Sequence, residues 1–363
     1  MGSVTSAERA SGTDALVIPL PRSSEGFFNG KPSKLPFSTT LAEGGWQELS
    51  SRLIPGVGIE DTALVSLEDG SRFAYRETSP LEQKWGISVD FTLPLGTRVN
   101  GLNTYIAHKL AQAGIRSRMV GTNQAPGYSL LHDAQAALEI LSTSDQRGVA
   151  EGGPYCVPEQ SIFYGYSMGI MKELGILGLA PLAQRYSHAT IGVDPCLAKE
   201  LKYKEHGRAR LLGYIGREVM QLPSMILEDV REHSLPNSLA YGRHLMSTAS
   251  LSPKYARTHW DKWQTLKTGE TGTFAAAIPK DEVAVIYVFD GSELNHSDEF
   301  EGQLANHPNV RFIHRDGYHL HGARRTMIKE VVAKATLAEI MVLDRATPKE
   351  MADALQKPLL KAA

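Results

Sequence analysis

The chain has 363 residues, of which 42% are hydrophobic and 21% are charged, and its formal net charge is −2 at pH 7. This length and balance are typical of a globular protein with one large α/β domain that carries an insertion, or with two domains. A net charge so close to zero supplies no field that would recruit nucleic acid or an anionic membrane, and no apolar run is long enough to span a bilayer. We therefore expect no nucleic-acid partner and no membrane span.

Compartment and cofactors can be predicted from a few features. Residues 1–14 are polar and lack the apolar core of a secretory signal. The two cysteines, Cys156 and Cys196, fit no metal-site spacing and are too few for a disulfide framework. The sequence contains no Walker loop, no Gly-x-Gly-x-x-Gly and no His-Glu-x-x-His motif. We expect a cytoplasmic protein with no cofactor and no metal.

The first part of the chain, residues 1–60, is rich in Ser, Pro and Gly. Its prolines break any long helix or strand. This composition predicts an N-terminal extension that wraps the core or stays partly mobile, with a short helix near Trp46 to Leu53.

From residue 61 onward, strand-like and helix-like stretches alternate. Two strand-like runs flank Asp69-Gly70, a turn signal typical of a hairpin. Apolar residues spaced three or four apart mark helices, and Gly114 ends the first of them. The elements predicted up to residue 141 are strands at 62–67, 72–77, 87–91 and 116–120, and helices at 102–113 and 132–141.

The next stretch joins a strand to a helix through Gly165-Tyr166-Ser167-Met168-Gly169. Apolar and aromatic residues before this turn suit a buried strand, and the apolar run at 170–182 suits a helix. The glycines avoid the collision that a Cβ would make in so tight a turn. The pattern is typical of a nucleophile elbow, which exposes the Oγ of Ser167 and places the N–H of Met168 at a helix start, where it can donate to an oxyanion.

Beyond the elbow the alternation is interrupted once. Helical periods without a convincing strand predict a helical cap, or lid, at 197–282. A capping box, Thr347-Pro348-Lys349-Glu350, predicts that one more helix ends the chain. The other elements expected here are strands at 189–193, 283–289 and 310–313, and a helix at 323–337. The core would thus be built from residues 61–196 and 283–363, as a mostly parallel sheet covered on both faces.

This order of elements resembles the α/β-hydrolase fold over roughly residues 62–343. The opening hairpin, the turn Pro126-Gly127-Tyr128-Ser129, the elbow and the stretch Asp316-Gly317-Tyr318-His319 after the last strand each resemble a motif of that family. The resemblance implies a doubly wound, mostly parallel sheet of about eight strands with a helical cap. It also implies the chain order Ser, acid, His in a catalytic triad.

The resemblance implies roles for individual residues. Ser167 would be the nucleophile, and His319 the base that takes its proton, with His321 as the main rival. Many family members have His-Gly after the third strand, whereas this chain has Thr92-Leu93-Pro94-Leu95-Gly96. Because proline has no N–H, Leu93 is our choice for the second oxyanion donor beside Met168, and Leu95 is the alternative.

The acid of the triad is left open among three residues. Glu293 lies at the family's usual offset behind a glycine-containing turn after the seventh strand, and Asp290, at the end of that strand, is the more usual residue type. Asp194, after the sixth strand, is a further candidate, since some family members place the acid there. The alternative interpretation of Asp194 is a turn residue before Pro195.

The function that this set of residues favours is a serine hydrolase. It would cleave a carboxylic ester, or a lactone, thioester or amide, of a small to medium acyl substrate through an acyl-enzyme. An acyltransferase with the same triad and a non-catalytic binding protein with the same fold are the alternatives. A homo-oligomer is left open.

Overall fold

A computed structural model of the chain describes most of the predicted core. The described residues are 27–28, 31–32, 38–82, 84, 88–92, 101–121, 123, 128, 130–150, 161–167, 169–170, 172–173, 176, 189–195, 220, 223, 227, 278, 280–291, 298–318 and 325–359. Of the predicted cap, the structure describes only a few residues, among them Met220, Pro223 and Leu227, each helical and exposed. The cap and the division of the chain into domains therefore stay predictions.

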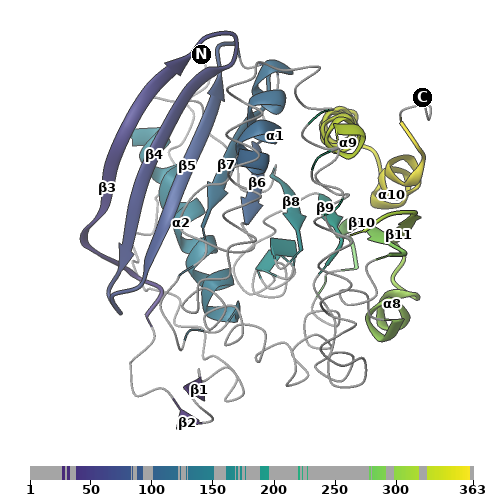
Figure 1. Ribbon diagram of the computed structural model, residues 1–363, viewed down its shortest axis with the longest axis horizontal. Coiled ribbons are helices and arrows are strands. Elements are labelled where there is room, and N and C mark those ends of the chain that lie inside the picture. The colour runs from purple at the N-terminus through teal and green to yellow at the C-terminus, as the bar shows by residue number, and fades with distance from the viewer. Residues whose placement is uncertain are drawn as a thin grey trace, which may run out of the picture.

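The described residues form an open nine-stranded sheet of order β11-β10-β9-β8-β6-β7-β5-β4-β3 (Figure 1). The first six strands of this order, from β11 to β7, pair in parallel with their neighbours. The last three, β5, β4 and β3, are added by antiparallel pairing. The strand bounds are β3 Leu41–Ile54, β4 Gly58–Leu67, β5 Arg72–Pro80, β6 Ser88–Thr92, β7 Arg116–Val120, β8 Ile162–Tyr166, β9 Ala189–Val193, β10 Val283–Phe289 and β11 Val310–Arg315. A separate pair joins β1, Phe27–Phe28, to β2, Lys31–Pro32.

Helices cover both faces of this sheet. One buried cluster joins it to α1 (Gly101–Gln112), α9 (Arg325–Leu343) and α10 (Pro348–Gln356). The other joins it to α2 (Leu130–Ala150), α8 (Asp298–Leu304) and the helical residues after the elbow. The alternation along β8 shows the division, because Phe163 belongs to the second cluster while Ile162 and Tyr164 belong to the first. The doubly wound, mostly parallel sheet predicted from the sequence is confirmed.

The strand directions decide which turns lie near the elbow. Strands β6 to β9 all end at one edge of the sheet, which we call the elbow edge because β8 ends there at Tyr166. Strand β5 runs the opposite way, so the turn between β4 and β5 also lies at the elbow edge. The turn between β3 and β4 lies at the far edge.

The predicted helix near Trp46 to Leu53 is wrong. These residues belong to β3, which pairs with β4 through two register irregularities. The ring of Trp46 packs 4.9 Å from that of Tyr75, measured between centroids. Pairing and packing against residues distant in sequence thus outweigh the local helical preference. The sheet consequently begins inside the predicted extension, at residue 41.

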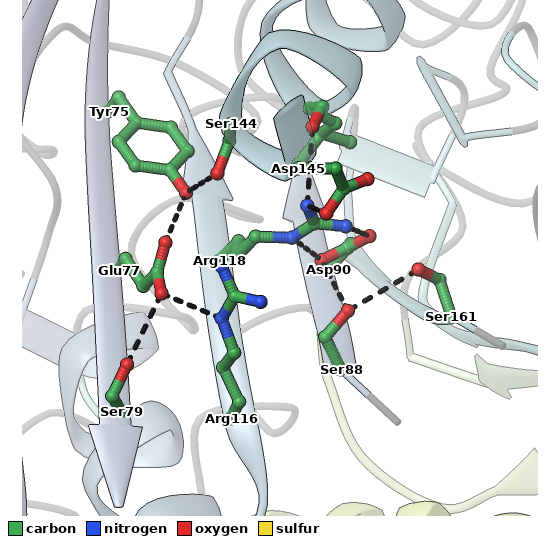
Figure 2. Close-up of polar contacts among 11 residues, drawn as sticks. Tyr75, Glu77, Ser79, Ser88, Asp90, Arg116, Arg118, Ser144, Asp145 and Ser161 are labelled. Atoms are coloured by element: carbon green, nitrogen blue, oxygen red, sulfur yellow. Dashed lines mark hydrogen bonds and ion pairs between the residues drawn. The ribbon is translucent and has the colours of Figure 1, made fainter. Parts of the chain in front are cut away.

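Beneath α2 the sheet buries a group of charged side chains (Figure 2). The guanidinium group of Arg118, with no exposed surface, donates to both carboxylate oxygens of Asp90, at 2.7 and 2.6 Å. It also donates to Asp145 and to the carbonyl of Leu141 in α2. Burial raises the pKa of Asp145 to about 6, although Arg118 acts to lower it. Arg118 therefore joins β6, β7 and α2 through one buried cation.

A second network of hydrogen bonds lies beside that of Arg118. The Tyr75 hydroxyl lies 2.7 Å from Glu77 and 2.6 Å from Ser144 of α2. Arg116 donates to Glu77 at 2.6 Å, so β5, β7 and α2 are joined again (Figure 2). Together with the contacts of Arg118, these hydrogen bonds fix α2 to three strands, β5, β6 and β7.

Candidate active site

Ser167 directly follows β8 and has a left-handed backbone conformation, with φ 57°. A non-glycine residue in this region costs about 1–3 kcal/mol and persists only where its surroundings impose it. Here the Ser167 N–H donates to the carbonyl of Val193, the last residue of β9, at 2.9 Å. Gly169 and Ile170 are already helical. The strand and the strained serine are present, and the described residues up to Ile176 show the start of the helix predicted from the motif.

Two glycines let the helix after the elbow lie against the sheet. A Cβ on Gly165 would lie 2.4 Å from Glu173 Oε2 and 2.5 Å from the Cα of Ile170. A Cβ on Gly192 of β9 would lie 1.7 Å from Ile170 Cδ1. At Gly165 the clash is with backbone atoms, so only glycine fits there, whereas at Gly192 a side chain would force Ile170 to move. Both positions bring the helix that follows Ser167 close to β8 and β9.

Asp194 is the second strained residue at the elbow edge, with φ 49°. It is 1% exposed and follows Val193, the residue whose carbonyl holds the Ser167 N–H. Its own N–H donates to the carbonyl of Tyr287 at 2.8 Å, and its Oδ1 accepts from the N–H of Phe289 at 3.4 Å. The structure thus places this carboxylate between the ends of β9 and β10, close in the sheet to Ser167.

Asp290 lies in different surroundings. Its side chain is 58% exposed, and its Oδ1 is 3.4 Å from Nδ1 of His314 on β11. The other ring nitrogen of His314 is 3.3 Å from Glu301 of α8. The carboxylate of Asp290 is therefore in contact with a histidine that lies on the strand, between Asp290 and α8.

The loops that follow β10 and β11 lie side by side. The Asp290 N–H donates to the carbonyl of Arg315 at 3.0 Å, and the Gly291 N–H to that of Gly317 at 2.7 Å. A Cβ on Gly291 would lie 2.5 Å from Cδ1 of Tyr318. The two loops predicted to carry the acid and the base are thus in direct contact. Six predicted site residues, alternatives included, lie outside the described part of the chain: Leu93, Leu95, Met168, Glu293, His319 and His321.

Sequence reasoning missed two ionisable side chains beneath the elbow. Lys172 and Glu173 have no exposed surface, although they interrupt an apolar run. Lys172 Nζ donates to the carbonyl of Gly121 at 3.3 Å. Burial, and then the charge of Glu173, raises the pKa of Tyr164. Adjacent opposite charges inside an otherwise apolar helix were the signal that could have found them.

Neither metal-site geometry nor a membrane-spanning helix is found in the described ranges. There, no group of three or more His, Cys, Asp or Glu side chains is placed to hold a metal ion. No helix in the same ranges is both long and apolar enough to cross a membrane.

Comparison with solved structures agrees with the architecture. The structure superposes on a soluble variant of monoglyceride lipase from Saccharomyces cerevisiae, in complex with a substrate analogue, with a TM-score of 0.50 and 12% identity, over 84% of this chain and 98% of that one. DcsB in complex with its substrate analogue gives a TM-score of 0.50 and 12% identity, over 77% and 98%. No protein-family model and no curated protein matches the sequence. The chain has the α/β-hydrolase fold.

Proposed function

We propose that the protein is a serine hydrolase that cleaves a carboxylic ester, or a lactone, thioester or amide, through an acyl-enzyme on Ser167. The observation that carries the proposal is the strained serine between β8 and a helix, held by the carbonyl of Val193. A serine in this conformation projects its Oγ away from the sheet, toward the space where an acyl carbon can approach. Strain of this kind clusters at active sites, where it presents a reacting group.

In the proposed mechanism a histidine activates the serine. His319, or His321, accepts the proton of Ser167 as the Oγ attacks the carbonyl carbon, and then returns that proton to the leaving group. The loop that precedes His319 touches the loop after β10, and this contact supports Glu293, three residues after Asp290, as the partner of the histidine. Asp290 itself is the less favoured choice, because its side chain is mostly exposed and is in contact with His314. The burial of Asp194 at the same edge supports that residue as the alternative. The N–H groups of Met168 and Leu93 would hold the oxyanion.

A labelling experiment tests the nucleophile. A fluorophosphonate probe should modify the wild-type protein on Ser167, and mass spectrometry should place the adduct there. Ser167→Ala should abolish labelling and acyl-ester turnover while leaving the melting temperature nearly unchanged, because this serine contributes little packing. A Ser88→Ala variant, which alters a buried serine far from the elbow, serves as the control and should keep its labelling.

Three other outcomes would change the proposal. An adduct on another residue would remove Ser167 as the nucleophile. The absence of any adduct would favour a non-catalytic binding protein of the same fold. Turnover only in the presence of an alcohol would favour an acyltransferase. A cytoplasmic location remains part of the proposal, and cell fractionation tests it.

A further inference from the structure

The helix that begins after Ser167 buries two opposite charges in succession. Lys172 and Glu173 both have no exposed surface, while Ile170 and Ile176 of the same helix lie in the apolar core. Burying an ion costs several kcal/mol, and well-packed apolar side chains of similar volume often stabilise a fold as well or better. Stability alone therefore does not account for a lysine at this position.

Lys172 connects this helix to the strand β7. Its Nζ donates to the carbonyl of Gly121, which directly follows Val120, the last residue of β7. The Gly121 N–H donates in turn to the carbonyl of Ala74 in β5, at 2.8 Å. Gly121 is thus the point where the chain leaves the sheet at the elbow edge and continues toward Tyr128 and α2. Lys172 fixes that point relative to the elbow.

Glu173 reaches the strand on the other side. Its Oε2 occupies the space where a Cβ on Gly165 would lie, two residues before Ser167 in β8. In the sheet, β6 lies between β8 and β7. Lys172 therefore contacts the residue that follows β7, and Glu173 lies against β8. These two strands flank β6, whose last residue, Thr92, precedes Leu93 in the sequence.

We infer that Lys172 is a positioning residue. Its hydrogen bond to Gly121 sets the distance between the helix that presents Ser167 and the segment that follows β7. Loss of that bond would let the helix that presents Ser167 shift relative to the sheet while both remain folded. A displacement of about 1 Å in a site of this kind can cost about 100-fold in rate. This inference rests on the proposed function.

The test compares two buried lysines. Lys172→Met removes the bond to Gly121. Lys334→Met is the matched control, because Lys334 on α9 also has no exposed surface and donates to the carbonyls of Leu355 and Lys357, but on the opposite face of the sheet. Each variant is measured for melting temperature, for kcat and KM on an aryl ester, and for hydrogen exchange of the peptide covering residues 121–129.

Lys172→Met should lower kcat by about 100-fold with KM within a few-fold of wild type, and exchange in residues 121–129 should accelerate. Lys334→Met should lower the melting temperature but keep kcat and that exchange rate. Lys172→Arg, which keeps a donor, should recover part of kcat. Wild-type kcat in Lys172→Met, or equal losses in both methionine variants, would overturn the inference.

The exchange measurement separates this inference from the proposed function. If the wild-type protein is neither labelled nor active, the proposed function fails, but faster exchange in Lys172→Met alone still shows that Lys172 holds the segment after β7. Unchanged exchange in that variant would refute the positioning role by itself.

Discussion

At the scale of single residues, the described part of the elbow edge contains two strained residues, Ser167 and Asp194, that are linked through one backbone hydrogen bond. The N–H of Ser167 is held by Val193, and Asp194 follows immediately. Ser167 could be predicted because its motif is local in sequence. The burial and strain of Asp194 could not, since both depend on how β9 lies beside β10.

The identity of the triad acid is a prediction at this scale. Asn and Gln replacements keep size and remove charge, so only the true partner of the histidine should cost about 10⁴-fold in kcat. Because the side chain of Asp290 is mostly exposed and is in contact with His314, we expect Asp290→Asn to keep most of its activity. The large loss should appear in Glu293→Gln or in Asp194→Asn.

The histidine base is tested by pH profiles of kcat/KM for two alanine variants. His319→Ala should remove the rise in activity that a neutral histidine base produces near pH 6–7, while His321→Ala should keep it. A 10⁴-fold loss in Asp290→Asn would contradict our interpretation of its contacts. Loss of the rise in His321→Ala alone would move the base by two residues.

At the scale of elements, α10 is held at both ends by contacts of different kinds. The Thr347 side chain accepts from the Glu350 N–H, and the Glu350 side chain accepts from the Thr347 N–H. This capping box could be predicted because it spans four residues. At the other end, Lys334 of α9 donates hydrogen bonds to the carbonyls of Leu355 and Lys357. No local sequence pattern indicated these hydrogen bonds.

Thr347→Ala should therefore lower the free energy of unfolding by about 0.5–2 kcal/mol, because the first turn of α10 loses its cap. Denaturant unfolding with intrinsic fluorescence measures the change. Thr347→Ser, which keeps the hydroxyl, is the control and should stay near wild type. A Thr347→Ala variant as stable as wild type would mean that α10 is held by its packing alone, through Met351 and Leu355.

Strand β3 shows what local patterns miss at this scale. Its residues have no clear alternation, and it becomes a strand because β4 pairs with it over most of its length. Strands β7, β9 and β10, in contrast, were predicted at their observed bounds. All three strands are buried along their whole length, and β9 and β10 show the continuous apolar or β-branched runs that are typical of such strands. Strand β7 is buried although it contains Arg116 and Arg118.

At the scale of the whole molecule, buried carboxyl groups set how stability depends on pH. Burial raises the pKa of Glu339 to about 8, and neither of its carboxylate oxygens has a hydrogen-bond partner among the described residues. Asp145 is raised to about 6. Burial acts to raise the pKa of Glu60 too, but the hydrogen bond from His108 and the charges of Arg76 and Arg52 lower it to about 2.

These shifts have opposite consequences. Groups with raised pKa values stabilise the fold fully at low pH and lose that contribution as pH rises through about 6 for Asp145 and about 8 for Glu339. Glu60 contributes above its unfolded pKa of 4.5 and loses that contribution as pH falls toward 2. The melting temperature should therefore be highest at about pH 5 and decline toward pH 8.

Thermal unfolding between pH 4 and pH 9 measures this profile. Glu339→Gln is nearly isosteric and cannot ionise, so it should flatten the decline between pH 6 and pH 8. The exposed Glu43→Gln is the control and should leave the profile unchanged. A melting temperature that is highest at pH 8, or an unaltered decline in Glu339→Gln, would show that Glu339 is not buried in its neutral form.

The alternating directions of β3, β4 and β5 also determine how the molecule could be oriented on a support. The turn at residues 55–57 lies at the far edge of the sheet from Ser167, and both Pro55 and Gly56 are exposed. A Cβ at Gly56 would meet nothing within 4 Å. A bead, an electrode or a fluorophore attached at position 55 would therefore face away from the elbow, and an immobilised layer of the protein would present its candidate site to the solution.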